Sequence, residues 1–184
     1  MFLDSKIATM FKEFLDFTDT ESSKMIKNSS TRWLSLEKCV DRLLHHWLAL
    51  LSYFNSHDDV EKPGHVKICA AFLRDHEMRL YYHFLSFIMQ PLNDFNTVFQ
   101  ADESRIGYLQ DEMNMLLRNF LGKFVRAKVI QTSKDFISIP FKDSKNQLND
   151  NIIAIGSTAR AYLIDNKEDV PPSTPQRFFI FAGL

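Results

Sequence analysis

Apolar residues recur every three or four positions along much of the chain. The clearest case runs from Trp33 to Phe54, where polar side chains such as Glu37 and Asp41 lie off the apolar stripe. That spacing is typical of one face of an α-helix packed on a core. Ser30 or Thr31 can cap the first turn. The pattern predicts one continuous helix over 33–54.

The same spacing predicts helices elsewhere in the chain. Their expected ranges are 4–17, 65–90, 101–124 and 155–164, with a last helix starting near 175. Pro91 is expected to end or kink the second of these, because proline removes a backbone donor and clashes with the preceding turn. Helix is then expected to resume as far as Phe99.

The pattern changes after Phe124. The stretches "VRAKVIQ" and "DFISIPF" are short and rich in β-branched residues, which favours extended backbone. Elsewhere, 17 phenylalanines and only 5 glycines favour helices packed on helices. We therefore expect an all-α fold, mainly a helical bundle, with short extended segments near 125–141.

The length of 184 residues indicates a single fragment, 1–184, and its abrupt pattern at both ends suggests a piece of something larger. The two cysteines lie in predicted helices, which favours a reducing, intracellular setting over a disulfide framework. The first residues lack the apolar core of a signal peptide. No window approaches the roughly 20 apolar residues of a membrane span, so no membrane partner is expected.

No set of residues with catalytic spacing emerges. Cys69, His76 and His83 are spaced by seven, which separates neighbours by about 10.5 Å along a helix, whereas metal–ligand bonds are about 2.0–2.3 Å. No nucleophile elbow, phosphate-binding glycine loop or zinc-protease motif occurs. We expect no catalytic residue, metal site, cofactor or small-molecule substrate.

The charged residues between Glu112 and Asp135 are all positive, although the formal net charge of the chain is -1. They are Arg118, Lys123, Arg126, Lys128 and Lys134. Such a stripe can neutralise phosphates. Cations near a helix C-terminus are also stabilised by the helix dipole without any partner. Both interpretations stay open.

Arg32 and Trp33 stand side by side where the helix over 33–54 is expected to begin. Trp33 continues the apolar stripe, so burial is one interpretation. An arginine beside an aromatic ring also suits binding of an extruded or single-stranded base, with one group on phosphate and the other stacked on the base.

The stretch "SSTRWLSLEKCVDRLLHHWLALLSYF" resembles the Thr-Arg-Trp motif and following helix of hAT-superfamily transposases, especially domesticated or degenerate members. "EFLDFTDTESSKMIKNSSTRWLSLEK" and "DESRIGYLQDEMNMLLRNFLGKFVRAKVI" are similar to the same group. The resemblance covers about residues 11–163.

The resemblance implies the helical insertion domain of an RNase H-like transposase, in which the Arg-Trp motif meets a DNA end. By that likeness Trp33 stacks on an extruded base, Arg32 lies at the same DNA end, and Thr31 is a neighbour. The basic residues Arg118, Lys123, Arg126 and Lys128 would contact the DNA backbone. A nuclear location follows from the same likeness.

The sequence differs from typical hAT transposases in three features that bear on its expected function. The Asp-Asp-Glu catalytic core, the BED-type zinc finger and the C-terminal dimerisation segment are not found in this sequence. We expect a catalytically incomplete, transposase-derived fragment that is not an enzyme and keeps DNA-hairpin or transposon-end binding. The alternatives are a helical protein–protein interaction module and a non-functional remnant of a decayed transposable element.

Overall fold

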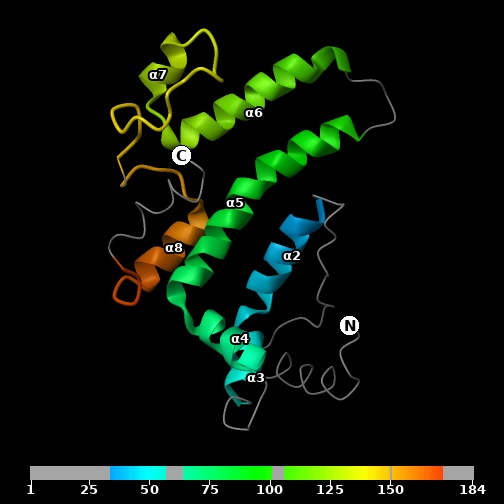
Figure 1. Cartoon of the computed structure of the whole chain (residues 1–184), viewed down its shortest axis with the longest axis vertical. Helices are drawn as coiled ribbons and strands as arrows, with labels where there is room; N and C mark the ends of the chain where they lie inside the picture. The colour runs from blue at the N-terminus through cyan, green and yellow to red at the C-terminus, as the bar shows by residue number, and fades with distance from the viewer. Residues whose placement is uncertain (1–33, 57–63, 101–105, 150, 172–184) are drawn as a thin grey trace. The chain divides into compact units, whose positions relative to one another are not determined.

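A computed structural model of the chain describes residues 34–56, 64–100, 106–149 and 151–171 (Figure 1). These residues form the helices α2 (Leu34–His45), α3 (Trp47–Ser56), α4 (Gly64–Arg74), α5 (His76–Phe99), α6 (Leu109–Phe124), α7 (Ala127–Thr132) and α8 (Ser157–Asp165), with a 3₁₀ turn, η1, at Ile106–Tyr108. The described ranges contain no strand, so the all-α prediction is confirmed. The helices predicted over 4–17 and from 175 lie outside them.

The single predicted fragment divides into two compact units, Met1–His83 (unit 1) and Phe84–Leu184 (unit 2). The boundary falls inside α5, where no linker-like composition marks it. Among the described helices, none combines the length and the apolar character needed to cross a lipid bilayer.

Unit 1 is built around Trp47, whose side chain is 1% exposed. The indole Nε1–H donates a hydrogen bond to the Leu73 carbonyl oxygen at 3.1 Å. The indole ring lies 5.9 Å from the rings of both Phe72 and Tyr82, centroid to centroid. A large aromatic side chain with its polar atom satisfied can be buried without an unpaired donor, and this one joins α3, α4 and α5.

The helix predicted over 33–54 is two helices, because the chain turns at His46. Backbone hydrogen bonds still cross the turn, from His46 N–H to the Arg42 carbonyl and from Leu50 N–H to the His46 carbonyl. Near the turn, the buried side chains include two that are not part of the predicted apolar stripe. His46 and Ala49 are fully buried, whereas Leu48 is 54% exposed.

The prediction that Pro91 ends the helix over 65–90 is wrong, because Pro91 lies inside α5, and the predicted extension of helix to Phe99 is confirmed. The break comes at Asp75, whose carboxylate accepts the backbone N–H groups of Glu77 and Met78 at 2.9 and 3.3 Å. That is the bonding of a helix N-cap. Helix α5 then continues through Pro91, with the buried Met89 and Asn93 on either side of it.

Unit 2 joins residues 84–99 of α5 to α6, α7 and α8. The extended segments expected near 125–141 are largely wrong, because Ala127–Thr132 forms α7 and Val125 makes only an isolated antiparallel bridge with Gln147. The β-branched side chains of this region pack in a buried cluster and do not form a strand. A cluster of buried residues comprises Leu121, Val125, Ile130 and Ile139, with Val129, Phe136 and Phe141 packed against it.

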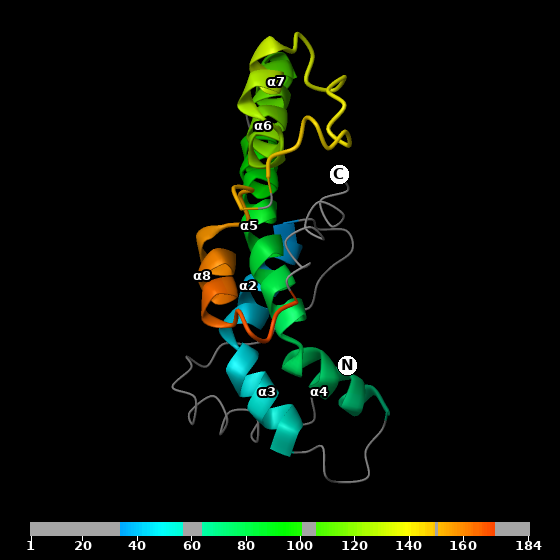
Figure 2. The same ribbon diagram turned by 90° about the vertical axis from the view of Figure 1, so that its left-hand side faces the viewer.

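The chain after α7 returns to the C-terminal end of α6, as Figure 2 shows for the segment coloured yellow. Leu148 N–H donates to the Phe124 carbonyl at 2.7 Å, and Ala154 N–H donates to the Lys123 carbonyl at 3.1 Å. The last four carbonyls of a helix have no partner within the helix. The returning chain supplies two of the missing donors, which fixes the segment 133–154 against α6.

Gly156 precedes α8 in a conformation that other residues rarely adopt, with φ 90° and ψ 151°. A Cβ atom there would lie 2.8 Å from Cβ and Cγ of Phe87 on α5. Both the backbone angle and the close approach therefore require glycine.

Gly156→Ala should destabilise the protein by about 1–3 kcal/mol from backbone strain alone, and the clash with Phe87 should add to this. Urea unfolding followed by circular dichroism measures the change. Gly122→Ala is the matched control, because Gly122 lies inside α6 with no atom within 4 Å of the added Cβ. It should stabilise the protein by up to about 1 kcal/mol. Equal effects of the two substitutions would contradict the assignment.

Candidate nucleic-acid interface

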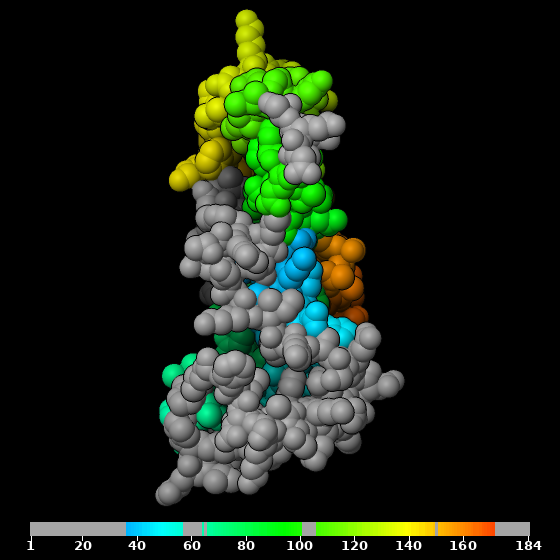
Figure 3. Space-filling view, turned by 90° about the vertical axis from the view of Figure 1, so that its right-hand side faces the viewer, coloured from blue at the N-terminus to red at the C-terminus, as the bar shows by residue number. Residues whose placement is uncertain are grey.

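The basic residues predicted to contact phosphate belong to a longer positive segment of unit 2. Residues 113–149 contain seven Lys and Arg and two Asp, a net charge of +5, against -1 for the whole chain. The charge is therefore concentrated on the C-terminal half of α6, on α7 and on the segment that returns to α6. Figure 3 shows side chains of these parts, in green and yellow, on the surface of unit 2.

The two acidic residues of this segment bond to the backbone of their own turns. The Asp135 carboxylate accepts the N–H of Ile137 at 3.0 Å, and the Asp143 carboxylate accepts the N–H of Lys145 at 3.0 Å. A carboxylate that accepts a backbone N–H has part of its charge compensated locally. The two acids reduce the seven positive charges to a net charge of +5, and these hydrogen bonds hold them within their own turns.

Arg126 and Lys128 are exposed and lie at the start of α7. The Arg126 N–H donates to the Asn146 carbonyl at 2.8 Å, and its side-chain Nε donates to the Gln147 carbonyl at 3.0 Å. The second bond uses one of the five N–H donors of a guanidinium group. It orients the group while leaving donors that can meet a phosphate.

Arg118 is exposed on α6, and its guanidinium carbon lies 5.2 Å from the centre of the Phe136 ring. Lys142 has a similar relation to Phe141, with Nζ 5.9 Å from the ring centre. Both distances fall within the range of cation–π attraction. Each of these two cations thus lies beside a half-buried aromatic ring.

Lys123 is placed differently from the other predicted contacts. Its side chain is half-buried, with Nζ 4.3 Å from the centre of the Phe87 ring on α5. Burial lowers the pKa of its ammonium group. Five residues along a helix correspond to about 140° of rotation, so Lys123 and Arg118 point to different sides of α6. The structure therefore does not bring Lys123 onto the face of Arg118.

Arg32 and Trp33 lie outside the described residues, so their predicted roles stay predictions. Sequence reasoning missed Lys142, Lys145 and the aromatic partners Phe136 and Phe141. The signal was available, because the positive charge continues past Asp135 to residue 149. What the pattern did not show is that the returning chain brings those residues to the end of α6.

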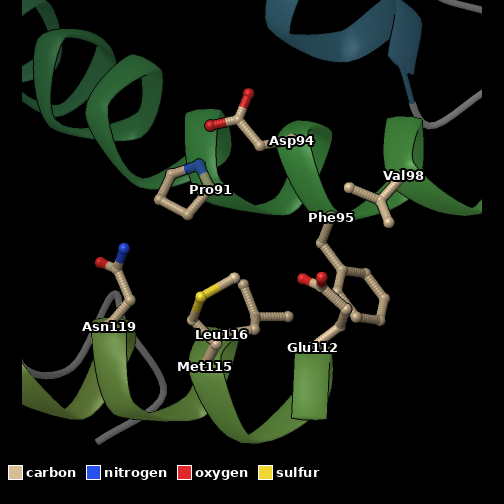
Figure 4. A pocket seen from close by; sticks show the side chains of 8 residues that line it. All are labelled: Pro91, Asp94, Phe95, Val98, Glu112, Met115, Leu116 and Asn119. Atoms are coloured by element: carbon tan, nitrogen blue, oxygen red, sulfur yellow. The ribbon is translucent and has the colours of Figure 1, made fainter. Parts of the chain in front are cut away.

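A groove between α5 and α6 has the opposite character (Figure 4). It has a volume of about 190 Å³ and includes Asp94 of α5 and Glu112 of α6 beside apolar side chains. In Figure 4 the Asp94 carboxylate points away from α6. None of the described residues that line the groove is a cation, so the groove is unsuited to phosphate.

Cys69, His76 and His83 do not share the single helix predicted over 65–90. Cys69 is exposed on α4, whereas His76 and His83 lie on α5. No group of three or more His, Cys, Asp and Glu side chains within the described ranges could hold a metal ion.

His83 has a pKa lowered from its ordinary value of 6.5, first by burial and then by the nearby Arg79 cation. The unfolded chain therefore binds a proton more readily than the folded one, and stability should fall as the pH drops below about 6.5. His83→Gln should reduce this dependence, measured by urea unfolding between pH 7.5 and 5.0. An unchanged pH dependence in the variant would contradict the prediction.

Comparisons of the whole chain with protein-family models, curated proteins and solved structures gave no match.

Proposed function

We propose that this chain binds DNA through the basic segment 113–149, as a catalytically incomplete relative of hAT transposases. The observation that carries the proposal is the net charge of +5 on this segment, with Arg126 and Lys128 exposed at its centre. Exposed cations release counterions from phosphates, and that release drives most of the non-specific affinity for nucleic acid.

The aromatic rings favour DNA with unpaired bases over a plain duplex. Phe136 and Phe141 are half-buried beside Arg118 and Lys142. Proteins that bind single strands combine a positive groove with rings on which bases stack. A hairpin offers both a charged stem and unpaired loop bases. Arg32 and Trp33 would add the base contact that the family resemblance implies.

Replacing both Arg126 and Lys128 by glutamine should weaken binding and reduce its salt dependence. For four phosphate contacts, affinity for the duplex stem should fall about 150-fold between 50 and 200 mM salt, because each contact adds about 0.9 to the slope of log K against log salt. When only two phosphates are still neutralised, the fall should be about 12-fold. Fluorescence anisotropy of a labelled hairpin, titrated at several salt concentrations, measures both slopes.

Lys167→Gln is the matched control, since Lys167 is exposed in unit 2 but lies outside the basic segment. It should leave the slope unchanged. A wild-type protein whose hairpin affinity does not change with salt would refute the proposal. The same holds if Lys167→Gln lowers the slope as much as the double substitution does.

Trp33→Ala tests the base contact separately. If Trp33 stacks on an unpaired base, the variant should lose about 1–3 kcal/mol of hairpin binding while its circular dichroism and unfolding midpoint stay as in the wild type. Because stacking carries no charge, the salt slope should not change. A variant that unfolds would show that Trp33 belongs to the core, and the stacking role would be abandoned.

A helical protein-interaction module is the second candidate, and exposed apolar residues around the start of α6 favour it. Ile106, Tyr108 and Met115 are 78%, 65% and 63% exposed. Apolar groups gathered on a surface are typical of a binding site for another protein. Binding through this surface should be insensitive to salt and abolished by Met115→Glu, whereas the DNA affinity should keep its salt dependence.

A further inference from the structure

Unit 2 contains an apolar cavity that shares only Phe141 with the proposed DNA contacts. Its volume is about 260 Å³, and Ile88 of α5 forms one wall. The other lining residues are Leu117, Phe120, Leu121, Phe124, Val125 and Phe141. All seven lining side chains are apolar, so the cavity offers no polar side chain to a ligand that lies within it.

The size of the cavity limits what can fill it. A cavity of about 150 Å³ lined by Leu, Ile and Phe stays dry and binds benzene. At roughly 30 Å³ for each water-sized group, the cavity of unit 2 holds about eight or nine carbon atoms. One short alkyl chain fits this volume, whereas the two long chains of a membrane lipid exceed it.

The charge near the cavity favours one kind of ligand head group over another. Six of the seven lining residues belong to the segment 113–149, which has a net charge of +5. Lys142 lies next to the lining residue Phe141, with its ammonium group 5.9 Å from the centre of that ring. A head group that leaves the cavity beside Phe141 would meet the Lys142 ammonium group, which favours an anion over a cation.

We propose that the cavity binds a free, single-chain carboxylate with an alkyl tail of about eight carbons. The tail occupies the space between Ile88, Leu117 and Phe141, and the carboxylate remains at the surface among the cations of the basic segment. This site does not depend on DNA binding.

Isothermal titration calorimetry with hexanoate and octanoate, in the absence of nucleic acid, tests the proposal. Each additional buried methylene should raise the affinity about fourfold, so octanoate should bind about 15-fold more tightly than hexanoate. The gain in affinity should stop near nine carbons, when the cavity is full.

The charge of the head group is tested in the same way, and octylammonium should bind more weakly than octanoate. Equal affinities for hexanoate and octanoate would overturn the proposal, as would tighter binding of octylammonium.

Two substitutions show where the ligand binds. Leu117→Trp should fill the cavity and abolish octanoate binding, whereas Met113→Trp, at a 40% exposed position on the same helix, should not affect it. If Leu117→Trp fails to fold, Ile88→Phe takes its place. Retained octanoate binding in a folded cavity-filling variant would overturn the assignment.

Sedimentation with phosphatidylglycerol vesicles separates a free carboxylate from a membrane source. If the protein binds octanoate, and cavity-filling variants remain bound to vesicles as the wild type does, the cavity has a soluble ligand. Vesicle binding without any octanoate binding would assign the basic surface to a membrane and refute the proposed cavity ligand.

Discussion

The end of α6 is the constraint on which the arrangement of unit 2 depends. Helix α6 stops at Phe124, and its last carbonyl groups need donors from outside the helix. Val125 N–H bonds back to the Leu121 carbonyl at 2.7 Å, while Leu148 and Ala154 of the returning chain donate to the carbonyls of Phe124 and Lys123. A buried helix end left unsatisfied would cost free energy for every missing bond. The hydrogen bonds from the returning chain therefore stabilise the end of α6 and fix the path of the chain after α7.

That return also determines where the positive charge lies. It brings the turns with Lys142 and Lys145 to the end of the helix that bears Arg118, and it supplies the carbonyl of Gln147 that orients Arg126. The apolar cluster of unit 2 also forms part of the cavity wall. Leu121 and Val125 belong to the cluster, Phe141 packs against it, and all three line the cavity. The positive charge on the surface of the segment and the apolar cavity beneath it therefore both follow from the packing of the returning chain on α6.

The sequence predicted the all-α class and most helix positions, because their apolar spacing is strong. The positions where one helix ends and the next begins were predicted less well. The turn at His46 lies within an unbroken apolar stripe. Asp75 lies in the polar run 74–77, which does not interrupt the helical spacing of the apolar residues around it. Val129 and Ile130 suggested extended backbone, yet tertiary packing makes them helical. For the proposed site, the charge pattern predicted Arg118, Lys123, Arg126 and Lys128 alike, and the folded chain adds that Lys123 is half-buried while the other three are exposed.

Hydrogen exchange of the protein with and without a saturating DNA hairpin tests whether DNA binds to the basic segment. Exchange should become slower in the peptides that cover 118–128 and 142–147, because DNA would lie across the end of α6 and the chain that returns to it. The peptides over 106–115 should exchange as in the free protein. Protection confined to 106–115 while DNA is bound would place the DNA on the apolar surface and refute binding by the basic segment.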